Sequence, residues 1–84
     1  MENKKEIKTL IEMLNKFISR EDCSMEIANK IEVTLDELFP DDDEIQDFVT
    51  YFASYRPSGG NYLYDEDSMV RKSMTLLNII TQRI

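Results

Sequence analysis

The sequence predicts an all-α fold: a small antiparallel four-helix bundle, formed by residues 1–84 as one domain. Four segments repeat apolar residues at steps of three and four, which is the spacing of amphipathic helices. No segment alternates apolar and polar residues as a half-buried strand does. The connections between the segments are about three to ten residues long, a length that favours antiparallel packing of consecutive helices. A chain this short has room for a single core, so any function is expected on its surface.

The first helix is expected over residues 4–19, where one apolar stripe consists of Ile7, Leu10, Ile11, Leu14, Phe17 and Ile18. The second helix is expected to begin after Asp22 or Ser24, because either side chain can accept a hydrogen bond from a free backbone N–H at a helix start. Its apolar face consists of Ile27, Ala28, Ile31 and Leu35.

The end of the second helix is open to two interpretations. Thr34 and Glu37 have the spacing of a capping box, which marks a helix start. The helix therefore either ends near Val33 and restarts as a short turn before Pro40, or continues through this segment.

The third and fourth helices follow aspartate-rich segments. Asp41, Asp42 and Asp43 are candidate N-caps of the third helix, whose apolar face contains Ile45, Phe48, Val49, Phe52 and either Tyr55 or Tyr51. Pro57 and the Gly59–Gly60 pair predict a break followed by a loop. Asp65 or Asp67 is expected to cap the last helix, with apolar residues Met69, Val70, Met74, Leu76, Leu77, Ile79, Ile80 and Ile84.

The composition excludes most catalytic chemistry. The chain has no histidine, so Ser-His-Asp, Cys-His and His-metal sites cannot form. Its two glycines are adjacent, which rules out the glycine-rich loops that cradle nucleotide phosphates. Runs of neighbouring acids do not provide the distinct environments that acid–base catalysis needs. We therefore expect no enzymatic activity, no cofactor and no metal ion.

The compartment is predicted from Cys23, the single cysteine. Small secreted domains normally carry paired cysteines, so an unpaired thiol indicates the cytoplasm. Its acidic neighbours Glu21 and Asp22 disfavour a reactive thiolate, and we expect an inert, small apolar side chain near a helix start. No signal peptide or membrane-spanning segment is predicted.

The formal net charge is −7, and it is unevenly distributed along the chain. Residues 21–67 carry fourteen acids and two bases, whereas residues 1–20 and 68–84 are mildly basic. An acidic block repels nucleic-acid phosphates and attracts cationic surfaces. The expected partner is therefore a basic protein, with no direct binding of nucleic acid and no membrane association.

Two groups of residues are the candidate contacts for this partner. The first, at the start of the third helix, consists of Asp41, Asp42, Asp43, Glu44 and Asp47. The second, before and within the start of the last helix, consists of Tyr62, Tyr64, Asp65, Glu66 and Asp67. Tyrosines interleaved with acids are typical of binding surfaces. The competing interpretation is an acidic face that is merely solvated.

Residues 55–80 contain a recognisable pattern: an aromatic helix end, a proline, a short polar loop, Asn-Tyr-x-x-Asp-Glu and a final helix. In this pattern the chain resembles the C-terminal half of the colicin-D-type immunity proteins, through Pro57, Asn61, Tyr62, Asp65 and Glu66. The resemblance implies a bundle that neutralises a tRNA-cleaving toxin by covering its basic cleft with acidic side chains. The chain departs from the family at Ala53, Arg56 and Ser58, where the family has acids, and at Tyr64, where it has an aliphatic residue.

The predicted function is therefore that of an immunity protein, or antitoxin, of a colicin or contact-dependent inhibition system. It would bind the nuclease domain of its cognate toxin. The alternatives are a bacteriocin-immunity-like bundle acting at the membrane and a small acidic adaptor subunit. The sequence leaves open whether the protein is a monomer or a weak dimer.

Overall fold

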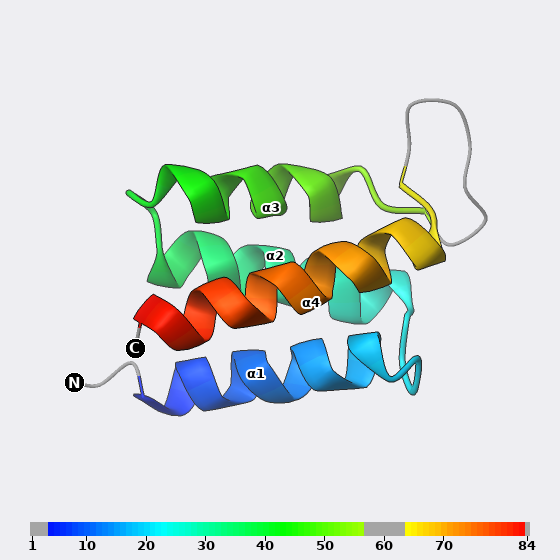
Figure 1. The fold of residues 1–84 in the computed structure, drawn as a ribbon, viewed down its shortest axis with the longest axis horizontal. Helices are drawn as coiled ribbons and strands as arrows, with labels where there is room; N and C mark the ends of the chain where they lie inside the picture. The colour runs from blue at the N-terminus through cyan, green and yellow to red at the C-terminus, as the bar shows by residue number, and fades with distance from the viewer. Residues whose placement is uncertain (1–3, 57–63, 84) are drawn as a thin grey trace.

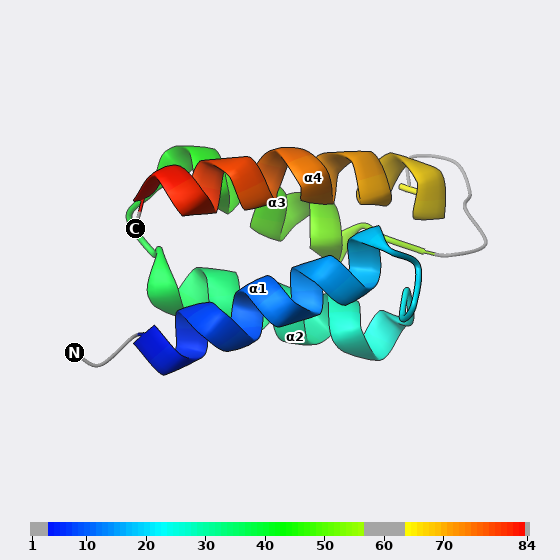
Figure 2. The same cartoon turned by 60° about the horizontal axis from the view of Figure 1, so that its bottom comes forward.

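The computed structural model describes residues 4–56 and 64–83, and this part of the chain forms four α-helices. They are α1 (Lys4–Ile18), α2 (Met25–Leu38), α3 (Asp43–Ala53) and α4 (Glu66–Arg83). Consecutive helices run in opposite directions, and the views in Figures 1 and 2 show them around one core. α1 and α3 each pack against both α2 and α4, so the helices form a closed ring of neighbours. The prediction of an antiparallel four-helix bundle is confirmed.

Three helices begin at side chains that the sequence offers as caps. Ser24 Oγ accepts a hydrogen bond from the Ile27 N–H at 3.3 Å, and Asp42 Oδ1 accepts one from the Ile45 N–H at 3.2 Å. Before α4, Asp65 Oδ1 accepts from the backbone N–H three residues later, at 2.9 Å. These bonds satisfy donors that have no partner within the helix. The structure thus selects Ser24, Asp42 and Asp65 from the predicted candidates.

The structure decides two helix ends that the sequence leaves open. α2 is continuous to Leu38, so the interpretation that it ends near Val33 is wrong. Thr34 lies within the helix, where its hydroxyl donates to the Lys30 carbonyl at 2.7 Å. α3 ends at Ala53, and Tyr55 follows it in a single backbone bridge with Tyr64.

The core takes side chains from all four helices and from Tyr55. Phe17 packs edge-to-face against the rings of Phe52 and Tyr55, with ring centroids 5.7 and 5.2 Å apart. Of the methionines expected on the apolar face of the last helix, Met69 is fully buried, but Met74 is 54% exposed and lies outside the core. No helix in the described residues is long and apolar enough to cross a membrane. The predicted break at Pro57 and the glycine pair, with the loop residues up to 63, lies outside the described residues.

One buried polar group has no partner in the described structure. The Ser73 hydroxyl lies on α4, is fully buried and makes no hydrogen bond. Leaving such a group unsatisfied costs about 1–3 kcal/mol.

Replacing Ser73 with alanine is therefore expected to increase the free energy of unfolding by about 1 kcal/mol, because the unpaired hydroxyl is removed and alanine favours the helix. A thermal melt should show the midpoint rising by about 4–8 °C. Asn78→Ala, at an exposed position of the same helix, is the control for helix propensity alone. A lower midpoint for Ser73→Ala than for wild type would contradict the assignment of an unsatisfied hydroxyl.

Candidate acidic binding surface

The two predicted contact groups lie at opposite ends of the bundle. We call them the α3 patch (Asp41, Asp42, Asp43, Glu44 and Asp47) and the α4 patch (Tyr64, Asp65, Glu66 and Asp67, with Tyr62 outside the described residues). α3 and α4 run antiparallel, so their first turns are separated along a molecule that is 39 Å long (Figure 1). The structure therefore does not join the two patches into one surface.

Part of the α3 patch is bound within the protein by Arg83 at the end of α4. Its Nε donates to Asp42 Oδ2 at 2.7 Å, and its Nη2 donates to Glu44 Oε1 at 2.8 Å. The Arg83 guanidinium, together with the Ile45 N–H, lowers the pKa of the Asp42 carboxyl below its ordinary value. Asp42 and Glu44 therefore tie the end of α4 to the start of α3, which is a structural role.

The other three acids of the α3 patch have no such role. Asp41, Asp43 and Asp47 are exposed, and no Lys or Arg nitrogen of the described residues lies within 4.0 Å of their carboxylates. Asp36 and Glu37, in the last turn of α2, are likewise exposed and unpaired within the described chain. Both acids belong to the acidic block of the sequence, but neither was predicted to be a contact residue.

A shallow hollow lies at the connection between α2 and α3. Its lining consists of three apolar residues, Leu38, Phe39 and Pro40, and the four acids Asp41 to Glu44. Apolar groups beside carboxylates suit a lysine or arginine side chain, whose aliphatic stem packs on apolar groups while its charged end remains near oxygen. The lining of the hollow thus has groups that can accept a basic side chain.

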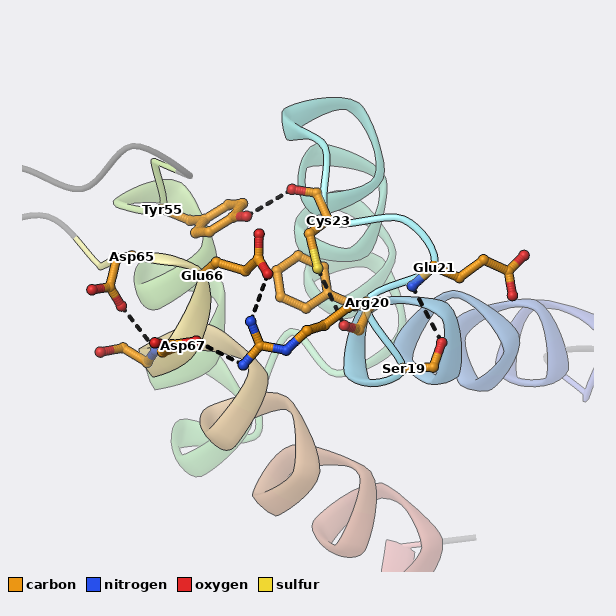
Figure 3. Close-up of polar contacts among 10 residues, drawn as sticks. Ser19, Arg20, Glu21, Cys23, Tyr55, Asp65, Glu66 and Asp67 are labelled. Atoms are coloured by element: carbon orange, nitrogen blue, oxygen red, sulfur yellow. Dashed lines mark hydrogen bonds and ion pairs between the residues drawn. The ribbon is translucent and has the colours of Figure 1, made fainter.

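The acids of the α4 patch have structural roles in the described structure. Arg20, which follows α1, donates to Glu66 at 2.6 Å and to Asp67 at 2.7 Å (Figure 3). Arg20 has a φ of 65°, a left-handed conformation that costs free energy for a residue other than glycine. Asp65 caps α4, and its bond from the Ser68 N–H lowers the pKa of its carboxyl. These contacts orient the three acids toward the protein's own groups.

The tyrosines divide into buried and half-buried positions. Tyr55 is fully buried, and its hydroxyl donates to the Cys23 carbonyl at 2.6 Å, joining the end of α3 to the connection between α1 and α2 (Figure 3). Burial also raises the pKa of the Cys23 thiol above its ordinary value, which disfavours the reactive thiolate. Tyr51 and Tyr64 are half-buried and pack edge-to-face, with centroids 5.4 Å apart.

The ring of helices also separates the charges. α2 and α3 are neighbours that together carry seven acids and one base, a net charge of −6. α1 and α4 are neighbours that carry seven bases and four acids, a net charge of +3. Charges that lie apart in the sequence thus form two opposed sides of one molecule, and the acidic side contains the hollow.

Among the described residues, no group of three or more Cys, Asp or Glu side chains is arranged to hold a metal ion. No protein family, curated protein or solved structure matches the chain.

Proposed function

We propose that this chain is an immunity protein that binds and neutralises the basic nuclease domain of a toxin, of the tRNA-cleaving kind implied by the sequence resemblance. The contact surface is the α2–α3 end of the bundle. The observation that carries this proposal is the set of exposed carboxylates, Asp41, Asp43 and Asp47, that lack a basic partner in the described chain. The first two of them line a hollow that also contains apolar residues.

A merely solvated acidic face is the competing explanation, and the distribution of internal contacts argues against it. The acids that make internal contacts have structural roles. Asp42 and Asp65 cap helices, Arg83 binds Asp42 and Glu44, and Arg20 binds Glu66 and Asp67. The remaining acids repel one another, which disfavours the compact state. A cationic partner would convert this repulsion into attraction.

The charge and the hollow would contribute to different stages of binding. A field of one sign speeds the encounter of oppositely charged proteins, and the effect weakens as salt increases. A lysine or arginine of the toxin that enters the hollow would pack its stem against Phe39 and Pro40 and place its charge beside Asp41 and Asp43. Exclusion of water from this contact in the complex would strengthen the attraction between the basic side chain and the carboxylates, and so slow dissociation.

Reversing charge at Asp43 and Asp47 tests the surface. The double variant Asp43→Lys, Asp47→Lys is expected to associate with the toxin domain about tenfold or more slowly at low salt, because steering is lost. Asp42 is left intact, since it caps α3 and binds Arg83. The matched control is Glu6→Lys, Glu12→Lys, which makes the same change in net charge on exposed positions of α1. Equal association rates for wild type and the α3 variant, measured by stopped flow, would exclude this surface.

The partner can be identified from the genetic neighbourhood. Proteins encoded by the adjacent reading frames would be co-expressed with this chain and purified through a tag on it. The proposal expects one of them to co-purify, to cleave RNA when alone and to lose that activity on addition of this chain. An RNA-cleaving neighbour that neither binds nor is inhibited would refute the immunity function.

A further inference from the structure

A groove runs along the outer face of the neighbouring helices α1 and α2 (Figure 2). It consists of two hollows of about 660 and 390 Å³, which share Thr9, Met13 and Lys30 and are therefore continuous. Apolar side chains contribute to its lining: Ile27 is buried, Met13 is half-buried and Val33 is 55% exposed. The α1–α2 groove thus leaves apolar surface in contact with water.

The charge of the α1–α2 groove differs from that of the acidic side of the molecule. Its charged lining residues are three acids and two bases: Glu12, Asp22, Glu26, Lys16 and Lys30. Their net charge is −1, whereas α2 and α3 together carry −6. A uniformly basic partner would bring positive charge against the two lysines, and an anionic surface would bring negative charge against the three acids. Neither kind of partner matches the groove by charge.

Opposite charges lie across the groove from each other at two levels. The N–H of Asp22 donates to the Lys16 carbonyl at 3.2 Å, which places Lys16 beside the start of α2, where Glu26 lies. One turn further along the two antiparallel helices, Glu12 lies on α1 and Lys30 on α2. Lys30 Nζ is 3.7 Å from Glu26 on its own helix. Neither Glu12 nor Lys16 has an opposite charge within 4.0 Å in the described residues.

This arrangement is complementary to a second copy of the same chain. A two-fold axis along the groove would place α1 of each copy against α2 of the other at the same level. Glu12 would then face Lys30 of the second copy, and Lys16 would face its Glu26. Each contact would occur twice, and the same interface would cover Val33 of both copies.

We propose that the protein forms a homodimer through the α1–α2 groove, with the two-fold axis along the groove. The inference does not depend on the proposed function. A face of two helices of 15 and 14 residues is about 22 Å long and about 20 Å wide. Burying it on both copies removes about 900 Å² from water, less than the roughly 1,200–2,000 Å² of stable complexes. The dimer is therefore weak, with a dissociation constant of about 10–100 μM.

The net charge of −7 is compatible with this association. α1 contacts α2 and α4 but not α3, so the exposed acids Asp43 and Asp47 lie on a helix outside the interface. Charges that are further apart than about 8 Å are largely screened at physiological salt. The α3 patch remains exposed in the dimer. At nanomolar concentration the protein is monomeric, so the association test with the toxin domain is unaffected.

Sedimentation velocity at protein concentrations from about 5 to 500 μM tests the dimer. We expect wild type to change from monomer to dimer across this range. A protein that is monomeric at the highest concentration would overturn the proposal.

Two charge reversals test the arrangement of the interface. In a homodimer of Glu12→Lys two positive charges face each other at both contacts, and in a homodimer of Lys30→Glu two negative charges do. Each variant alone is expected to have a dissociation constant about tenfold or more above that of wild type. In the heterodimer of the two variants opposite charges face each other at both contacts, so their equimolar mixture should associate about as well as wild type. A mixture as weak as the single variants would refute the two-fold arrangement.

A neutral substitution tests the apolar part of the groove. Val33→Gln is expected to weaken the dimer about tenfold or more, because an apolar contact is lost on both copies. Met74→Gln is the matched control, since Met74 is 54% exposed on α4, outside the groove. Far-UV circular dichroism verifies that both variants keep their helices. Equal dissociation constants for the two variants would exclude the α1–α2 groove as the interface.

Discussion

Replacing Tyr55 with alanine is expected to remove about 3–5 kcal/mol from the free energy of unfolding, the range for loss of a large buried aromatic side chain. Tyr55 is fully buried, packs against Phe17 and bonds the Cys23 carbonyl through its hydroxyl. A domain of this size has a total stability of about 4–13 kcal/mol, so the variant should be near its unfolding threshold. Urea unfolding followed by far-UV circular dichroism measures the change.

Tyr55→Phe separates the hydrogen bond from the packing. The phenyl ring keeps the contact with Phe17, but the Cys23 carbonyl loses its donor, and the expected loss is about 1–3 kcal/mol. Tyr51→Phe is the matched control, because Tyr51 is half-buried and its hydroxyl has no hydrogen bond in the described structure. A loss for Tyr55→Phe no larger than for Tyr51→Phe would contradict the role of this bond.

Alkaline pH is expected to destabilise wild type more than Tyr55→Phe. Burial, above all, raises the pKa of Tyr55 from 10.0 to about 12, and the nearby Cys23 and Glu66 act in the same direction. The folded state therefore favours the protonated phenol. The associated stability is complete below pH 10 and is lost as the pH rises from 10 to about 12, a change of about 2–3 kcal/mol.

The measurement is urea unfolding at several pH values across this interval. Lysines and the other tyrosines titrate in wild type and in Tyr55→Phe alike, so the difference between their stability curves isolates Tyr55. We expect the two curves to converge as the pH rises. Parallel curves would mean that the folded protein does not resist ionisation of this phenol. Tyr51→Phe should retain the wild-type dependence on pH.

Local sequence predicted the helices and their starts because each signal acts within a few residues. The apolar spacing identified all four helices, and the caps at Ser24, Asp42 and Asp65 each bond a backbone N–H three residues later. At Thr34 the capping-box pattern left the end of α2 open, and the helix in fact continues through it, with Ile31 and Leu35 buried on either side. Burial of a continuous apolar face determined the length of α2.

The candidate site could be predicted only in part. The sequence located the acids, but it could not distinguish Asp43, which has no basic partner in the described chain, from its neighbours Asp42 and Glu44, which bind Arg83. Nor did it indicate that Tyr64 would lie against Lys72 and Tyr51. In each case the partner comes from a different helix.

The amino-acid sequence alone thus determined the helical class, the candidate caps at the helix starts, the absence of histidine chemistry and the excess of negative charge. The tertiary structure alone decided which charges remain available. Arg83 lies 41 residues from Asp42, and Arg20 lies 46 residues from Glu66, so no local pattern connects them. Packing of the helices brings these ends together, because the buried faces set the order of the ring and the charges at the helix ends follow.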